Sequence, residues 1–233
     1  MAITVAGIET NLHRIRECVA RSTARVGRQP EEVTIIGVSK THPAEAIRAA
    51  YEAGIRHFGE NRVQEFQEKF EAVKDLGATW HLIGHLQGNK VSRALKLFRL
   101  LDSLDSLPLA QKLEASVRGA ETLPVLIEVR TDAAATKSGV LPEDVPQLVE
   151  VLLGMKQLMV RGLMTIPAYF EDPDSVRPFF RELRMLRDSL VRRFQHPLPV
   201  LSMGMSHDFE VAIEEGSTEV RIGTALFGAR AQI

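Results

Sequence analysis

The chain has 233 residues, of which 45% are hydrophobic and 25% are charged, so it is long enough to bury a sizeable core. Its 29 Lys and Arg residues nearly balance its 30 Asp and Glu residues, which gives a formal net charge of -1. This balance excludes a strong whole-chain field for nucleic acid or an anionic membrane, so any anion recognition must be local.

The single cysteine, Cys18, indicates a reducing compartment, because one cysteine forms neither an internal disulfide nor a cysteine-based zinc site. No apolar stretch approaches the roughly 20 residues of a membrane span. Charged residues appear early in the N-terminal segment, unlike in a signal peptide. We therefore expect a cytoplasmic protein without nucleic-acid or membrane partners, and we separately expect a monomer.

Short apolar or β-branched segments alternate with longer amphipathic segments along most of the chain. The first element is a helix predicted over residues 3–26, before any strand. Eight strands are predicted at residues 33–38, 56–58, 79–83, 98–104, 124–129, 159–165, 199–202 and 219–222. Start signals from Pro or Asn predict further helices at residues 44–53, 62–74, 143–153 and 174–194.

This alternation predicts an α/β protein: a single (β/α)8 TIM barrel with an extra N-terminal helix. A doubly wound open sheet is the alternative. We expect one domain over residues 1–233, because no flexible linker, charge block or repeat divides the chain. The aromatic residues expected in the core are Phe58, Phe66, Phe98 and Phe227.

Side chains just after the strands should form the site, because the strand C-termini of such a barrel meet at one face. Six candidates occupy these positions: Lys40, Asn61, His85, Thr165, Ser206 and Thr224. The Lys40 amine attacks an aldehyde only when deprotonated, which burial or a neighbouring cation favours. Arg221, on the last predicted strand, would lie beside Lys40 where the barrel closes.

Small and hydroxyl-bearing residues follow the last two predicted strands, namely Gly204, Ser206, Gly223 and Thr224. A phosphate prefers backbone N–H donors and short hydroxyls, and barrels often bind phosphate after their seventh and eighth strands. Together with Lys40, these residues predict a site for an aldehyde that carries a phosphate. A sugar-phosphate enzyme with Lys40 as its Schiff-base residue would use the same groups.

Two other patterns do not support chemistry. His81 and His85 have the spacing of a helical zinc pair, but they lie in a predicted strand, where that separation spans ~13 Å. Ser206 lies in a segment similar to a nucleophile elbow, but the second glycine is absent and His207 is adjacent in sequence. We expect neither a metal site nor a serine hydrolase.

The most specific segments are 38–40 (VSK), 58–65 (FGENRVQE), 80–87 (WHLIGHLQ) with 89–90 (NK), 137–139 (KSG), 162–167 (GLMTIP), 201–206 (LSMGMS) and 220–224 (VRIGT). In these segments the chain resembles, over nearly its whole length, the pyridoxal phosphate homeostasis proteins, also called the YggS or PROSC type. Agreement in all of the segments by chance is implausible.

The resemblance implies a fold-type III barrel like the N-terminal domain of alanine racemase, which binds pyridoxal 5'-phosphate (PLP) as an internal aldimine on Lys40. The other cofactor-binding residues that it implies are Asn61 near the ring hydroxyl, Arg221 at the pyridine nitrogen, and Ser206, Gly223 and Thr224 at the phosphate. Members have no established reaction and are thought to buffer PLP or deliver it, which implies PLP-dependent apoenzymes as recipients.

Two positions depart from the family pattern. Arg130 stands where many relatives carry Asn, and Gly88 stands where Ser is frequent. Neither position belongs to the phosphate motif, but Arg130 changes the polar contacts expected at the rim of the site.

The resemblance leaves a carrier and a racemase as alternatives. Racemisation needs a base on each face of the substrate, and Lys40 would serve only one. Tyr51 is expected near the far face of the barrel, so Tyr169 is the candidate second base. An arginine at the pyridine nitrogen leaves that nitrogen neutral and weakens the electron sink. The prediction is therefore a PLP carrier without robust catalysis, with the racemase as the alternative.

Overall fold

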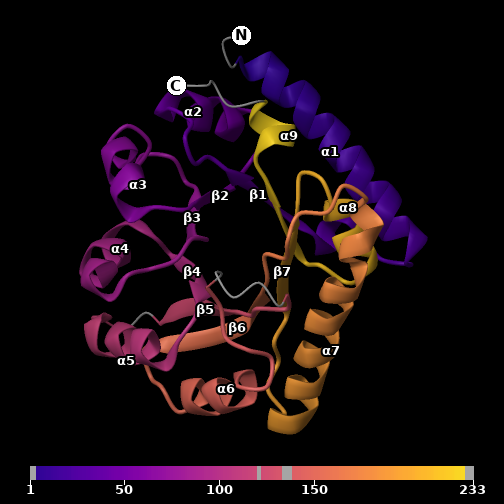
Figure 1. The fold of residues 1–233 in the computed structure, drawn as a ribbon. Helices are drawn as coiled ribbons and strands as arrows, with labels where there is room; N and C mark the ends of the chain where they lie inside the picture. The colour runs from indigo at the N-terminus through magenta and orange to yellow at the C-terminus, as the bar shows by residue number, and fades with distance from the viewer. Residues whose placement is uncertain (1–3, 120–121, 133–137, 229–233) are drawn as a thin grey trace.

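A computed structural model of the chain, which describes residues 4–119, 122–132 and 138–228, shows a closed parallel barrel (Figure 1). Its strands follow one another around the barrel in sequence order, and β8 pairs with β1. They are β1 (Thr34–Val38), β2 (His57–Glu60), β3 (Thr79–Leu82), β4 (Leu100–Leu104), β5 (Leu123–Glu128), β6 (Leu158–Met164), β7 (Val200–Met205) and β8 (Glu219–Ile222). The predicted TIM barrel is confirmed, and the open sheet is wrong.

Helices lie between the strands and cover the outside of the barrel (Figure 1). They are α1 (Val5–Arg25), α2 (Ala44–Glu52), α3 (Val63–Phe70), α4 (Val91–Leu97), α5 (Leu107–Ser116), α6 (Val145–Leu153), α7 (Arg177–Phe194), α8 (Phe209–Glu214) and α9 (Thr224–Phe227). Of the helices in the described ranges, none is long and apolar enough to cross a membrane.

Two predicted helices have different bounds in the structure. The helix predicted over 62–74 ends at Phe70, and turns follow it. The helix predicted over 174–194 starts later, because Pro173–Val176 forms a 3-10 helix first. Pro178 then lies in the first turn of α7, where its missing N–H costs no helical hydrogen bond.

The core between the barrel and α3 is aromatic. Phe66 of α3 packs against Trp80 of β3 and Phe98, with ring centroids 4.7 and 5.1 Å away, and Phe58 of β2 lies 5.3 Å from Trp80. All four side chains are buried, as is Phe227 in α9. The predicted core phenylalanines are therefore confirmed.

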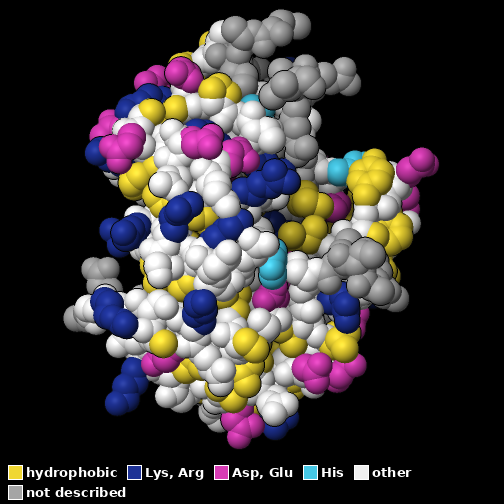
Figure 2. Space-filling view, turned by 60° about the vertical axis from the view of Figure 1, so that its left-hand side comes forward, with side chains coloured by type: hydrophobic (Ala, Val, Ile, Leu, Met, Phe, Trp, Pro, Cys, Tyr) yellow, Lys and Arg dark blue, Asp and Glu magenta, His cyan; other side chains and the backbone are white. Residues whose placement is uncertain are grey.

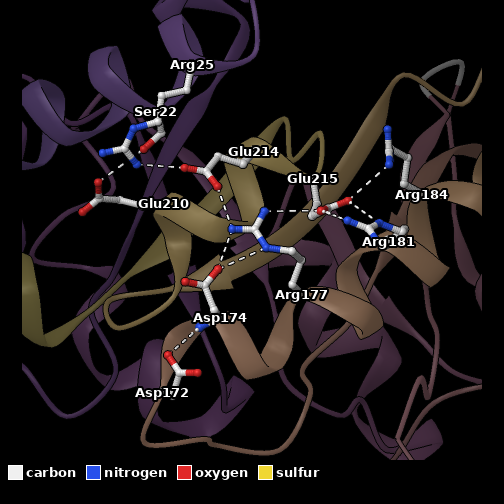
Figure 3. A network of polar contacts seen from close by, with 10 residues as sticks. All are labelled: Ser22, Arg25, Asp172, Asp174, Arg177, Arg181, Arg184, Glu210, Glu214 and Glu215. Atoms are coloured by element: carbon white, nitrogen blue, oxygen red, sulfur yellow. Dashed lines mark hydrogen bonds and ion pairs between the residues drawn. The ribbon is translucent and has the colours of Figure 1, made fainter.

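Helix α1 covers the closure of the barrel and lies alongside α8 and α9 (Figure 1). A network of ion pairs joins α1, α7 and α8 (Figure 3). Its centre is Arg177, which donates to Glu214 at 2.7 Å and Glu215 at 3.3 Å, while Arg25 of α1 donates to Glu214 at 2.8 Å. Glu215 is buried and Arg177 and Glu214 are partly buried, so their ion pairs are screened less by solvent than exposed pairs would be.

Candidate functional site

One cavity of about 370 Å³ opens at the C-terminal ends of the strands. The six residues expected to contact a cofactor all line it: Lys40, Asn61, Ser206, Arg221, Gly223 and Thr224. On the face in Figure 2, Lys and Arg side chains gather beside a hollow that has hydrophobic and His side chains at its edge. Two other candidates, His85 and Thr165, are not part of the cavity lining.

The residue after Lys40 has an unusual backbone conformation. Thr41 has a φ of 67°, a left-handed conformation that is costly for a β-branched residue. Its N–H donates to Glu65 Oε1 of α3 at 2.5 Å. Although burial opposes it, this bond together with Lys69 lowers the pKa of Glu65. The chain therefore turns sharply after β1 and directs half-buried Lys40 into the cavity.

Lys69 of α3 fixes the loop on both sides of Lys40. Its Nζ donates to the Ser39 carbonyl at 3.1 Å, to the His42 carbonyl at 3.2 Å and to Glu60 Oε1 at 2.8 Å. Glu60 is fully buried and also accepts the Ser39 hydroxyl at 2.7 Å. Burial raises the pKa of Glu60, and the hydrogen bonds and charge of Lys69 oppose that rise.

Asn61 owes its position to a glycine in the loop after β3, Gly84. A Cβ atom added to Gly84 would lie 2.3 Å from the Asn61 carbonyl oxygen, far inside van der Waals contact. The loop after β3 can approach the end of β2 this closely only without a side chain at position 84. Gly84 thus places Asn61 at the cavity wall.

Two backbone amides meet a hydroxyl in the part of the lining that follows β7 and β8. Ser206 Oγ accepts hydrogen bonds from the N–H groups of Gly223 and Ala225, each at 3.2 Å. Short hydroxyls and backbone amides, such as these and the Thr224 hydroxyl, are the groups that an anion such as phosphate prefers, and here both amides donate to Ser206 Oγ. Gly204, by contrast, packs against α8: its φ is 95°, and an added Cβ would lie 2.6 Å from Ala212 Cβ.

Arg221 enters the cavity from inside the barrel, where it is buried. Its Nη1 donates to Ser202 Oγ and its Nη2 to the Thr165 carbonyl, both at 2.8 Å. Burial lowers the pKa of Arg221, while buried carboxylates nearby oppose this. An arginine keeps its charge even so, so the cavity contains a fixed cation beside a β1–β8 seam.

The two tyrosines lie outside the cavity lining. Tyr51 lies under the Arg56 guanidinium, 4.2 Å from the ring centroid, near the start of β2. Tyr169 is 73% exposed, and its ring lies 5.1 Å from that of His207, which does line the cavity. Tyr169 is therefore near the rim but is not held over the site.

The structure shows the surroundings of His81 and His85 and of the two positions that depart from the family pattern, Arg130 and Gly88. His81 is buried inside the barrel, while His85 is half exposed with its Nδ1 2.6 Å from Asp105. The backbone N–H of Arg130 donates to the Val140 carbonyl at 2.9 Å, and Gly88 starts a 3-10 helix, Gly88–Lys90. Lys137, in the KSG motif, lies outside the described residues.

Sequence reasoning missed several residues of the site. His42 lines the cavity and stacks on Phe227, with ring centroids 4.8 Å apart. Lys69 supports the Lys40 loop from a helix, and its spacing of four residues from Glu65 was the available signal. Met205 and His207 also line the cavity, next to Ser206 in the sequence.

The site as a whole combines an amine, a buried guanidinium and a hydroxyl–amide cradle around one cavity at the strand ends. An amine can condense with a carbonyl carbon, a buried cation can face a polar atom, and hydroxyls with backbone amides suit a phosphate. This arrangement defines a barrel that binds a small, anionic carbonyl compound.

Comparisons with known proteins agree with the barrel fold. Residues 8–231 match the family model described as the N-terminal domain of alanine racemase. Alanine racemase of Corynebacterium glutamicum shares the fold, with a TM-score of 0.75 at 17% identity over 98% of this chain and 62% of that chain.

Closer relatives narrow the family. A pyridoxal phosphate homeostasis protein of Aquifex aeolicus is 50% identical over 94% of this chain and 96% of its own length. The Escherichia coli K12 protein of the same name is 41% identical over 96% and 97%. PipY of Synechococcus elongatus, solved with PLP bound, has a TM-score of 0.82 at 36% identity and covers 95% of this chain and 100% of its own. The chain belongs to the pyridoxal phosphate homeostasis protein family.

Proposed function

We propose that this chain, acting as a single domain and a monomer, binds PLP and buffers or delivers it in the cytoplasm without robust catalysis. The observation that carries this proposal is the meeting of Lys40 with the Ser206 cradle and Arg221 around one cavity. The family relatives carry the name of homeostasis proteins, and PipY was solved with PLP bound.

Each cavity residue has a role in this proposal. Bound PLP would supply an electrophilic aldehyde and an electron-accepting ring. Lys40 donates the amine that condenses with the aldehyde, and Arg221 keeps the ring nitrogen unprotonated by placing a cation beside it. Phosphate contacts come from Ser206, Gly223 and Thr224, and Asn61 lies near the ring hydroxyl.

Three observations favour a carrier over a racemase. Tyr169 is mostly exposed and lies outside the cavity lining, so its hydroxyl is not positioned at a second face of a substrate. The fixed charge of Arg221 weakens the electron sink that carbanion chemistry needs. The relatives are named for homeostasis rather than for a reaction. The recipients that fit this role are PLP-dependent apoenzymes.

The covalent assignment is tested by reduction. Protein loaded with PLP should be yellow, and borohydride followed by peptide mapping should find the label on Lys40. Lys40→Ala should remain colourless, while Lys74→Ala, at an exposed lysine, should behave like the unsubstituted protein. A label on any other lysine would refute the assignment.

The racemase alternative has its own test. Loss of the α-proton from L-amino acids is measured in deuterated water, with Tyr169→Phe as the comparison. If the PLP-loaded protein catalyses this exchange and Tyr169→Phe abolishes it, the protein is a racemase and the carrier assignment is wrong.

A further inference from the structure

A second group of titratable side chains lies inside the barrel, and the proposed function uses none of them. A ring nitrogen of His81 and carboxylate oxygens of Asp102 and Glu219 lie within 4.8 Å of one another. The three residues come from β3, β4 and β8, and all are buried. Glu219 and Arg221 are two residues apart on β8, so both side chains point to the same side of the barrel wall.

Ser202 links this group to the cavity. Its Oγ accepts the Arg221 Nη1 hydrogen bond at 2.8 Å. Ser202 is also the register partner of Glu219 across the β7–β8 ladder, and its hydroxyl stabilises the charged form of that carboxyl. Arg221, Ser202 and Glu219 therefore form a continuous polar chain from the cavity into the interior.

The two carboxyl groups are incompletely satisfied. Within the described ranges, Asp102 Oδ1 and Glu219 Oε2 are buried without a hydrogen-bond partner. No Lys or Arg nitrogen of these ranges forms an ion pair with either group, although Arg221 lies nearby on β8. Burial, and then the charge of Asp102, raise the pKa of Glu219 to about 7. One proton between the carboxyls would supply the missing donor and remove the repulsion.

A path for that proton runs towards the N-terminal mouth of the barrel. His57, the half-buried first residue of β2, has its Nδ1 3.0 Å from His81 Nε2, and His81 Nδ1 is 3.0 Å from Asp102 Oδ2. Burial alone would lower the pKa of His81, but Asp102 outweighs it and raises the pKa. Burial, and then the charge of His81, lower the pKa of His57, so the two shifts favour a proton on His81 over one on His57.

We propose that Glu219 is a positioning residue for Arg221, acting through Ser202, and that a proton shared by Glu219 and Asp102 couples binding of the anionic ligand to pH. The ionised Glu219 carboxylate accepts the Ser202 hydroxyl proton, which leaves a Ser202 oxygen lone pair facing Arg221. When Glu219 takes up a proton from water, the interior loses one negative charge. An anion beside Arg221 then binds more tightly, and its binding draws that proton in.

Other charged groups also face Arg221, from β5 and from the loop after β7: Glu128 and Asp208. Glu128 is buried with a raised pKa, caused mainly by burial, but it accepts a hydrogen bond from Ser138 at 2.9 Å. It therefore provides a matched control: a buried carboxyl near the same guanidinium that is outside the Ser202 chain.

The same three ligand atoms would also suit a divalent cation. Both ring nitrogens of His81 are already within 3.0 Å of polar partners, so a metal would have to displace one of them. This favours the proton over the metal. Elemental analysis of the purified protein decides it, since stoichiometric metal that Glu219→Gln removes would overturn the shared proton.

The test uses PLP as the probe, so this part rests on the proposed function. The dissociation constant of PLP is measured from about pH 6 to about pH 8.5 for the unsubstituted protein and for Glu219→Gln. At each pH the two dissociation constants are divided, because the titrations of PLP and Lys40 affect both proteins alike and cancel in this ratio. The two proteins should match at low pH. At high pH the unsubstituted protein should bind about three- to tenfold more weakly. A ratio that does not change with pH would overturn the proposal.

Three further variants locate the effect. Asp102→Asn should move the midpoint to lower pH, since it removes the charge that raises the pKa of Glu219. Ser202→Ala should weaken PLP binding at every pH and flatten the dependence, and an unchanged profile would refute positioning through Ser202. Glu128→Gln should keep the midpoint; if it abolishes the transition, the wrong carboxyl has been assigned. If Glu219→Gln fails to fold, the Asp102→Asn variant decides: a midpoint at lower pH supports the proposal, and an unchanged or higher midpoint overturns it.

A measurement without cofactor separates this inference from the proposed function. The folded pKa of Glu219 is raised, so its contribution to stability is present at low pH and lost as pH rises through about 7. Unfolding of the cofactor-free protein should show this loss, and Glu219→Gln should not. Failure of Lys40 labelling would refute the proposed function, whereas the absence of this difference would refute the shared proton.

Discussion

Lys69, which holds the loop on both sides of Lys40, gives the sharpest stability prediction. Its ammonium is the cation that compensates the fully buried carboxylate of Glu60. Lys69→Met keeps the length of the side chain but removes the ammonium that contacts Glu60 at 2.8 Å. Glu60 is completely buried, so it cannot recover hydration in place of the lost partner. Breaking such a pair typically costs about 3–5 kcal/mol.

The structure also sets a limit on this cost. Glu60 can escape the charge penalty by taking up a proton, which from an ordinary pKa of 4.5 costs about 3.4 kcal/mol at pH 7, at about 1.36 kcal/mol per pH unit. The folded pKa lies above the unfolded one, so the lost stability should return as pH falls towards about 4.5. We therefore expect a loss of about 3 kcal/mol near pH 7 that shrinks steadily in acid.

Urea unfolding of Lys69→Met near neutral pH and near pH 5 measures this directly. The matched control is Lys69→Met with Glu60→Gln, which removes the buried charge and should restore most of the stability. It should not restore tight PLP binding, because the contacts to the Ser39 and His42 carbonyls remain absent. A loss that is independent of pH and survives the second substitution would refute the reasoning.

Two further substitutions test the core and the cavity wall. Gly84→Ala should weaken PLP binding and lower the free energy of unfolding by about 1–3 kcal/mol, because its Cβ displaces the Asn61 backbone. The control is Gly88→Ala, whose Cβ meets the flexible Lys112 side chain. Equal PLP binding by both variants would contradict the placement of Asn61. Phe66→Ala should cost about 3–5 kcal/mol in thermal or urea unfolding with little change in PLP affinity, and a loss under about 1 kcal/mol contradicts the packing described for α3.

The alternation of segments was enough to predict the barrel because buried parallel strands form short apolar runs between amphipathic helices. Strand β8 was located to the residue, whereas β2 runs on to Glu60, two residues past its predicted end. Glu60 was missed because a buried carboxylate in a strand depends on Lys69, which is distant in space until α3 packs. Local sequence patterns do not contain that information.

Five of the six predicted residues that line the cavity closely follow a strand, and the sixth, Arg221, lies on β8, whereas the residues that support them were not predicted. The left-handed turn at Thr41 has no signal in its own residue type, and the Glu65 carboxylate that accepts its N–H comes from α3. The interior group of His81, Asp102 and Glu219 comes from three strands, and no spacing along the chain connects them. The sequence shows where a strand ends more clearly than what its inward side chains meet.

The pairing of β1 with β8 determines when during translation the site can be completed. Position 36 is paired with Arg221, so the amine and the anion cradle come from segments that are far apart in the chain. A nascent chain exposes Lys40 to the cell long before the groups that would retain a cofactor have been made. Stable loading must therefore wait until the last strand has left the ribosome and completed the ring.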